Sequence, residues 1–363
     1  MDARERFLLN MNFKKSDRPF RWEAPAFWPS TIKNWKNQGL PEWVTEENIG
    51  EYFKMDPIKF IPVKSGWTGT PFYPYFKEKI IAEDKNNIIK LEKDGIIKKQ
   101  RKTNFDTSMP QFIKFPVKDL DDFNKIKFRL DPTSRERLPK NWKKLIVEYN
   151  KRDYPLGMFI CGSFGHPRNL LGDVNLMYAL YDNLSLIKAI MDNWLELYEG
   201  YIDIVCQDVI PDFVMIWEDM AYRNGPLISP EHFKKYMFPY LRKLIEFIRN
   251  KGIKVVILDS DGDIKKLIPI FIDAGVNALF PFEVQSGMDI VEIRKQYGEK
   301  FAIIGGIDKK LLLDKKAITE EIDRKLPYML SRGGYIPSLD HSVPVNIPLD
   351  VFKYFLKLVR SYE

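Results

Sequence analysis

The chain has 363 residues, 45% of them hydrophobic, and its 57 Lys and Arg against 50 Asp and Glu give a formal net charge of +7. The charges of both signs are interleaved along the chain, which is typical of a solvated surface and gives no reason to expect nucleic-acid binding. Its two cysteines form no CxxC pair, which excludes a disulfide scaffold and a cysteine zinc ribbon. The sequence lacks a signal core and an apolar run of about 18 residues, so we expect a soluble, cytoplasmic protein away from membranes.

The first 150 residues are expected to form an extension of one domain that covers residues 1–363. Residues 1–43 are rich in Trp, Phe and Pro, too apolar for a disordered leader, and should pack on the rest of the protein. Residues of about 72–103 contain three strand-like runs, at 76–82, 88–92 and 96–101, separated by turn clusters. This pattern predicts an antiparallel β meander, which is an excursion from the main fold.

Residues 151–363 alternate short apolar runs with helix-like segments. The runs cover residues 157–161, 213–217, 255–258, 278–282, 301–306 and 335–339, and the helix-like segments include 170–181, 185–206, 230–250, 288–297 and 317–330. Buried parallel strands read as continuous apolar runs, and their alternation with helices indicates βα units. The pattern predicts an α/β fold, a TIM (β/α)8 barrel.

Acidic residues follow five of these runs. They are Glu218 and Asp219, Asp259 and Asp261, Glu283, Asp308, and Asp340 with His341. The C-terminal ends of barrel strands surround the active site, so these side chains should converge on one pocket.

Several of these residues have side chains suited to proton transfer. A carboxylate pair such as Glu218 and Asp219, beside Trp217 and Tyr222, can split its pKa values into one acid and one base. We therefore predict that Glu218, Asp219, Tyr222, Asp261 and His341 are catalytic, with Trp217, Asp308 and Asp340 contacting substrate. The alternative is that these carboxylates cap helices or bind loop amides.

A metal site is a second interpretation of the same acids. Asp259, Asp261, Glu283 and His341 offer nitrogen and oxygen ligands that could hold zinc. Satisfied loop residues are the alternative. The run Asp259-Ser-Asp-Gly-Asp263 lacks the spacing of a calcium loop.

Two further segments carry candidate substrate contacts. Ser163, His166 and Arg168 follow the run at 157–161 in a loop that contains glycine, so they are expected at the same pocket. Arg21 and Glu23 form a charged pair among aromatic residues, and arginine suits a carboxylate or phosphate of a substrate. An internal ion pair is the alternative for these two residues.

A set of short motifs resembles the uroporphyrinogen decarboxylase superfamily over almost the whole chain. The motifs are Arg4-Glu-Arg-Phe7, Trp35 to Gly39-Leu-Pro41, Trp217-Glu-Asp219, Ser229-Pro-Glu231, Asp261-Gly-Asp263, Gly305-Gly-Ile-Asp308 and Asp340-His341. The resemblance implies a TIM barrel, and the superfamily contains both decarboxylases and corrinoid-linked methyltransferases.

The sequence also departs from both branches. The arginine-rich segment of the decarboxylases is replaced by Phe20-Arg-Trp-Glu-Ala-Pro25, and Asp56 is only a loose match to their early catalytic Asp. The thiolate zinc site of some methyltransferases is replaced by Asp259-Ser-Asp261. A substrate with many carboxylates needs more cations than this.

The resemblance therefore favours methyl transfer between a small O- or N-methylated substrate and a corrinoid carried by a partner protein, with zinc on carboxylate and His ligands. The first alternative is a uroporphyrinogen decarboxylase, which needs no cofactor. The second is a tetrapyrrole or corrinoid binder without catalysis. A homodimer is left open.

Overall fold

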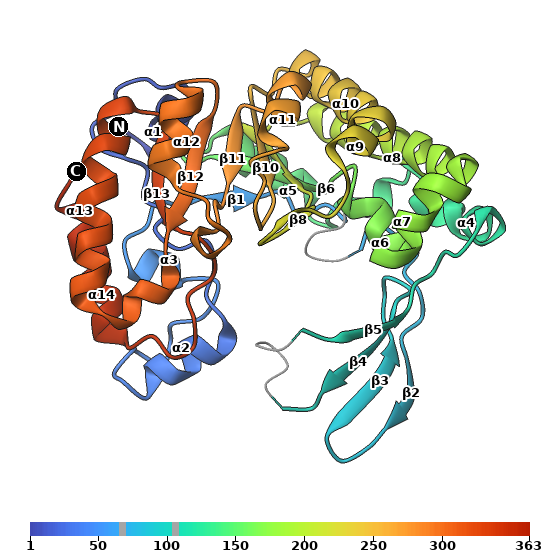
Figure 1. Ribbon diagram of the computed structural model, residues 1–363, viewed down its shortest axis with the longest axis horizontal. Coiled ribbons are helices and arrows are strands. Elements are labelled where there is room, and N and C mark those ends of the chain that lie inside the picture. The colour runs from blue at the N-terminus through green and yellow to red at the C-terminus, as the bar shows by residue number, and fades with distance from the viewer. Residues whose placement is uncertain (65–69, 104–108) are drawn as a thin grey trace.

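The computed structural model describes residues 1–64, 70–103 and 109–363, and its centre is a curled sheet of parallel strands (Figure 1). The strand order is β1-β6-β7-β10-β11-β12-β13, and every neighbouring pair is parallel. Their bounds are β1 (Lys59–Phe60), β6 (Leu156–Cys161), β7 (Phe213–Trp217), β10 (Val255–Asp259), β11 (Ala278–Phe280), β12 (Ala302–Ile307) and β13 (Tyr335–Leu339). Helices cover the outside of the sheet, so the predicted α/β class and parallel βα architecture are confirmed.

The helices follow the strands along the chain. Their bounds are α1 (Ala3–Met11), α2 (Pro29–Lys36), α3 (Ile49–Tyr52), α4 (Leu120–Ile126), α5 (Trp142–Asn150), α6 (Gly165–Leu171), α7 (Asp173–Asp182), α8 (Leu184–Cys206), α9 (Pro230–Tyr236), α10 (Phe238–Asn250), α11 (Ile268–Ala274), α12 (Ile290–Tyr297), α13 (Lys315–Arg332) and α14 (Leu349–Arg360). One expected helix, 230–250, is two helices that meet at Met237, because Pro239 cannot continue the hydrogen-bond ladder of α9. Ser229 caps α9 by accepting a hydrogen bond from the His232 amide at 3.1 Å.

An irregular N-terminal segment takes the position where an eighth strand was expected. The Arg21 carbonyl accepts a hydrogen bond from Asp56 N, just before β1, at 3.0 Å. The Glu23 carbonyl accepts one from Leu339 N, at the end of β13, at 2.9 Å. Phe27 then forms a parallel bridge with Val343. The segment thus joins the two edge strands of the sheet, and its broken, Pro-rich sequence explains why it is not a regular strand.

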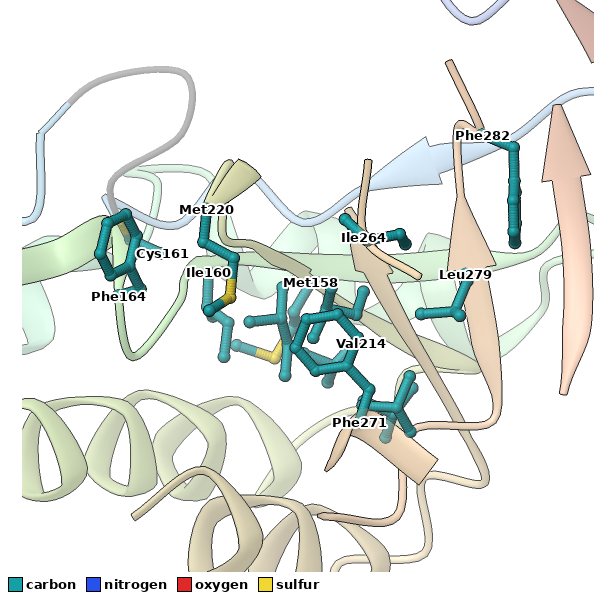
Figure 2. Close-up of a cluster of buried hydrophobic side chains, with 14 of the residues drawn as sticks. Met158, Ile160, Cys161, Phe164, Val214, Met220, Ile264, Phe271, Leu279 and Phe282 are labelled. Atoms are coloured by element: carbon teal, nitrogen blue, oxygen red, sulfur yellow. The ribbon is translucent and has the colours of Figure 1, made fainter. Parts of the chain in front are cut away.

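Successive side chains along each strand point to opposite faces of the sheet, and they form two separate hydrophobic clusters. Side chains such as Met215 and Ile257 point to the concave side of the curled sheet, where they share a cluster with Phe7 of α1. Their neighbours, such as Val214, point outwards against the helices in the cluster that Figure 2 shows. Because Asp259 follows Val255 and Ile257 at a spacing of two, its side chain lies on the inner face.

A separate antiparallel sheet extends away from the barrel (Figure 1). It consists of β2 (Lys79–Glu83), β3 (Asn87–Leu91), β4 (Ile97–Arg101) and β5 (Gln111–Lys114), of which β2 to β4 lie in the region expected to form a meander. The fourth strand, β5, was not anticipated. A small hairpin of β8 (Ala221–Tyr222) and β9 (Gly225–Pro226) lies after β7.

In the described part of the chain, each helix is too short or too polar to cross a lipid bilayer.

Candidate active site

A cavity of about 760 Å³ lies at the C-terminal ends of the strands, beside β5. Four acids (Asp173, Asp219, Asp261 and Glu283), four aromatic residues (Phe112, Phe115, Trp217 and Tyr222) and three bases (Arg168, Arg223 and Lys310) are among its lining. The cavity therefore combines aromatic walls with three strand-end acids, Asp219, Asp261 and Glu283, which we call the acidic floor. The strand ends gather much of the predicted ring of acids, and β5 adds aromatic residues that the sequence did not single out.

Glu218 lies behind the cavity and is held by backbone amides. Its side chain is 0% exposed. Oε1 accepts hydrogen bonds from Ser163 N and Ser163 Oγ, both at 2.8 Å. Oε2 accepts from Phe164 N at 2.7 Å and Gly165 N at 3.1 Å. Burial raises the pKa of Glu218, and these hydrogen bonds oppose the shift. Four donors make this carboxylate an anchor for the start of α6.

Asp219 is close to Asp261 at the floor of the cavity. Its backbone has a φ of 44°, a strained conformation for a residue with a side chain. Asp219 Oδ1 accepts a hydrogen bond from Asp261 N at 3.3 Å. Burial raises the pKa of Asp219, and the positive charge of Arg168 opposes this. The strained turn thus keeps two carboxyl groups on neighbouring strand ends together.

Asp259 and Asp261 extend this acidic group. Asp259 is 7% exposed, and burial raises the pKa of its carboxyl well above the ordinary range, with the charges of Asp219 and Asp261 adding to the effect. Burial also raises the pKa of Asp261 to about 7, assisted by the charges of Asp219 and Glu283 and opposed by Lys309. Close carboxyl groups in a poorly solvated site cannot all ionise at neutral pH. Asp261 therefore carries a proton in part of the molecules at pH 7.

Gly262 holds the Asp261 loop against the β8–β9 hairpin. Its φ of +83° is in the left-handed region, and a Cβ atom there would lie 2.4 Å from the Ala221 carbonyl oxygen. Gly262 N donates a hydrogen bond to Glu283 Oε2 at 3.2 Å. Only glycine allows this approach, so the loop is fixed between two strand ends. Tyr222, on the hairpin, is 63% exposed at the cavity wall.

Lys309 is the cation among the remaining acids. Its Nζ lies 3.9 Å from Glu283 Oε1 and 3.5 Å from Asp340 Oδ1. Asp340 is 0% exposed and also accepts hydrogen bonds from Val284 N and Lys309 N. Asp308 accepts from Gln285 Nε2 at 2.6 Å and from Lys310 N. These two acids thus fix loops. The sequence gives one signal for Lys309, its place directly after a strand-end acid.

His341 joins the group from the last strand. Its Nε2 lies 3.8 Å from Asp261 Oδ2, and its ring stacks on Trp28 with centroids 6.3 Å apart. Burial lowers the pKa of His341, and Lys309 lowers it further. A neutral imidazole next to a partly protonated carboxyl can exchange a proton with it.

The loop after β6 supplies three predicted residues that have separate environments. Arg168 lies in the cavity wall, with its guanidinium 4.9 Å from the Trp217 ring centroid, and it donates a hydrogen bond to the Asp219 carbonyl at 2.6 Å. Ser163 binds Glu218, and His166 is buried, 1% exposed. Of the three, Arg168 faces the acidic floor.

Arg21 and Glu23 lie away from this cavity, in ion pairs with the C-terminal region. Arg21 pairs with Glu363 at 2.5 Å, and Glu23 with Arg360 at 2.7 Å. The internal ion pairing that the sequence left open is therefore present, although with distant partners. Asp56 is likewise engaged, with Arg18 at 2.6 Å and Arg6 at 3.1 Å.

The four predicted zinc ligands do not form a compact set of donors. Among residues 1–64, 70–103 and 109–363, no three His, Cys, Asp or Glu side chains are grouped so that they could hold a metal ion. Glu283 is engaged by Gly262 N and by Ser286 Oγ at 2.9 Å, and Asp259 lies behind the floor. The residues present do not fit a bound zinc ion in this arrangement.

A comparison with known families identifies the family of this chain. The profile of the family described as uroporphyrinogen decarboxylase (URO-D) matches residues 103–362. The chain belongs to the uroporphyrinogen decarboxylase family. The match includes every strand from β6 to β13 and thus every strand end that supplies an acid to the cavity.

Relatives of this URO-D family protein are distant. A uroporphyrinogen decarboxylase of Helicobacter pylori (strain Shi470) is 23% identical over 249 residues, which are 67% of this chain and 67% of that protein. The corresponding protein of strain P12 is 26% identical over 184 residues, 50% of this chain and 51% of that protein. That of Campylobacter lari (strain RM2100) is 30% identical over 136 residues, 37% and 38% of the two chains.

A solved structure supports the fold over the full chain. A methyltransferase from Methanosarcina mazei superposes with a TM-score of 0.63 at 14% sequence identity, covering 100% of this chain and 99% of that one. At this identity the likeness shows that the URO-D family chain shares that fold.

Proposed function

We propose that this protein transfers a methyl group from a small O- or N-methylated compound to a corrinoid carried by a partner protein. The observation that carries the proposal is the composition of the cavity, in which four acids outnumber three bases among the lining residues that the structure describes. A tetrapyrrole with many carboxylates would meet repulsion from Asp219, Asp261 and Glu283. A small methylated compound that packs on aromatic walls needs no such set of cations.

Asp261 is suited to protonate the heteroatom that the methyl group leaves. When a methyl group leaves an oxygen or an uncharged nitrogen, that heteroatom gains electron density and needs a proton. Asp261 has a pKa of about 7, so at neutral pH its Oδ2 can hold the proton and donate it. His341 Nε2, 3.8 Å away, is placed to return a proton afterwards.

The neighbouring residues position the substrate. The Trp217 ring, with Arg168 on it at 4.9 Å, and the Phe112 and Phe115 rings provide flat apolar surfaces beside the acids. These rings would also exclude water from around Asp261, which keeps its proton affinity high.

The rim of the cavity fits a corrinoid presented by another protein. Phe112, Met109 and Tyr222 line the cavity and are 44%, 86% and 63% exposed, so they form an uncovered apolar rim. Such a rim suits contact with a large flat ring, and Met109 and Tyr222 would hold it. When bound, the corrinoid would supply a cobalt atom that accepts the methyl group.

The test is a methylation assay with the reduced corrinoid protein and a panel of methoxylated aromatics and methylamines. Methylation of cobalt, followed by absorbance, should occur with at least one donor. Asp261→Asn should slow it by about 100-fold or more, as expected for loss of a general acid. Asp263→Asn is the matched control, because Asp263 pairs with Lys265 on the same loop and does not line the cavity. No methylation from any donor would refute the proposal.

Decarboxylation of a uroporphyrinogen-like substrate is the second candidate, because the curated relatives named above are uroporphyrinogen decarboxylases. Incubation with uroporphyrinogen separates the two functions. Formation of coproporphyrinogen, without any corrinoid protein, would establish the decarboxylase.

A further inference from the structure

A second cavity, of about 300 Å³, adjoins the first and is lined by His166, a histidine for which the proposed reaction has no role. It lies between α6 and the meander. Trp217, Phe112 and Asn169 line both cavities. A single ligand could therefore extend from the acidic floor into this second space.

His166 is a buried polar side chain, and one of its nitrogens has no hydrogen-bond partner among the residues that the structure describes. The residue is 1% exposed, and in the described part of the chain nothing bonds to its Nε2 atom. Its ring contacts Tyr198 edge to face, with centroids 6.1 Å apart. Burial lowers the pKa of His166 to about 3, so the imidazole is neutral at physiological pH. A buried polar atom without a partner is costly, and a ligand that bonds to it removes that cost.

The other groups around this cavity decide the charge of what it would bind. Lys98 is neutralised by Asp94, with Nζ and Oδ2 2.7 Å apart. Asn169 is uncharged, and its Nδ2 atom donates a hydrogen bond to Cys161 Sγ at 3.7 Å. Phe72 and Phe112 contribute apolar surface. Among the described lining residues, a charged ligand group would find no net opposite charge, whereas a hydroxyl or amide would find a neutral imidazole.

We propose that the second cavity is a binding subsite for an uncharged hydrogen-bonding group, a hydroxyl or a primary amide on an apolar or aromatic stem, and that His166 Nε2 binds this group. The subsite goes beyond the proposed methyl transfer. It would bind its ligand whether or not a corrinoid protein is the partner.

Three probes of similar shape test the proposal: 2-phenylethanol, ethylbenzene and phenylacetate. Binding to the full-length protein is measured by calorimetry in the absence of any corrinoid protein. We expect 2-phenylethanol to bind at least tenfold more tightly than either of the other probes. In His166→Phe, which keeps a ring against Tyr198, this preference should fall to within twofold. His232→Phe is the control, because His232 lies on α9 and lines neither cavity.

A second measurement keeps the test decisive if His166→Phe does not fold. The chain has three histidines, so selective ¹⁵N labelling resolves each imidazole. Addition of 2-phenylethanol should shift the His166 Nε2 resonance, and ethylbenzene should leave it in place. Equal affinities for the three probes, or a His166 resonance that 2-phenylethanol does not move, would overturn the subsite. Neither result depends on methyl transfer, so the two proposals can fail separately.

Discussion

Replacement of Glu218 by glutamine should destabilise the protein rather than change its chemistry alone. In Glu218→Gln the amide oxygen can retain the bonds from Ser163, but the new NH2 group faces the N–H groups of Phe164 and Gly165, which now bond to Oε2 at 2.7 and 3.1 Å. Two hydrogen bonds to a charged acceptor are lost, at about 1.5 to 3 kcal/mol each. The gross loss is therefore about 3 to 6 kcal/mol.

One effect reduces this loss. Burial raises the pKa of Glu218, which means that the ionised carboxylate carries a desolvation penalty that the neutral amide avoids. We therefore expect the lower end of the range, a decrease of about 3 kcal/mol in the free energy of unfolding.

Urea denaturation at pH 7, followed by far-UV circular dichroism, measures this quantity. Glu46→Gln, an exposed residue of the N-terminal extension, is the control and should change the unfolding free energy by less than about 0.5 kcal/mol. Suppose that Glu218→Gln unfolds like the wild type and yet has no activity. The carboxylate would then act in the reaction, and the anchoring role assigned to it here would be wrong.

Three further predictions concern protonation and backbone conformation. Methyl-transfer activity should fall as the pH rises through about 7, because Asp261 must be protonated to act as an acid, and Asp261→Asn should remove this limb of the pH–rate profile. Folding lowers the pKa of His166 to about 3, whereas in the unfolded chain this pKa is about 6.5. The contribution of the neutral imidazole to stability is therefore complete above about pH 6.5 and is lost as the pH falls towards 3. At pH 5 the wild type should have lost about 2 kcal/mol more unfolding free energy than His166→Phe, and equal losses would contradict the assignment. Gly305→Ala should lower the free energy of unfolding by more than about 3 kcal/mol, because the φ of Gly305 is +106° and the new Cβ would lie 2.1 Å from the Pro281 carbonyl oxygen. The control is Gly298→Ala, where φ is +58° and nothing lies within 4 Å of the new Cβ, so the loss should be about 1 kcal/mol. Thermal or urea unfolding measures both.

The main strands could be predicted because their hydrophobic pattern is local. The runs at 213–217 and 335–339 match β7 and β13 residue for residue, since buried parallel strands are apolar on both faces. The segment 21–27 could not be predicted as part of the ring, because its hydrogen-bond partners are near residues 56 and 339 and its own sequence has no strand pattern.

The positions of the acids could be predicted, but their individual environments could not. The rule that strand ends converge places Asp219, Asp261 and Glu283 around one cavity. It does not distinguish them from Glu218, whose partners are backbone amides that look alike in any sequence. The aromatic wall was missed for a related reason. Phe112 lies on β5 and Phe115 directly after it, beyond the residues expected to form the meander, and only tertiary packing brings them to the strand ends.

The contacts of segment 21–27 with β13 and α14 have a consequence for synthesis on the ribosome. Glu23 bonds to Leu339 N and to Arg360, more than three hundred residues later. While the chain emerges, the side of segment 21–27 that pairs with β13 stays uncovered until β13 has been translated, and the inner aromatic cluster stays incomplete until then. Contacts of such sequence separation form slowly, and a half-made sheet with an open edge is prone to aggregate. Nascent chains of this protein should therefore depend on chaperones until β13 and α14 have been synthesised.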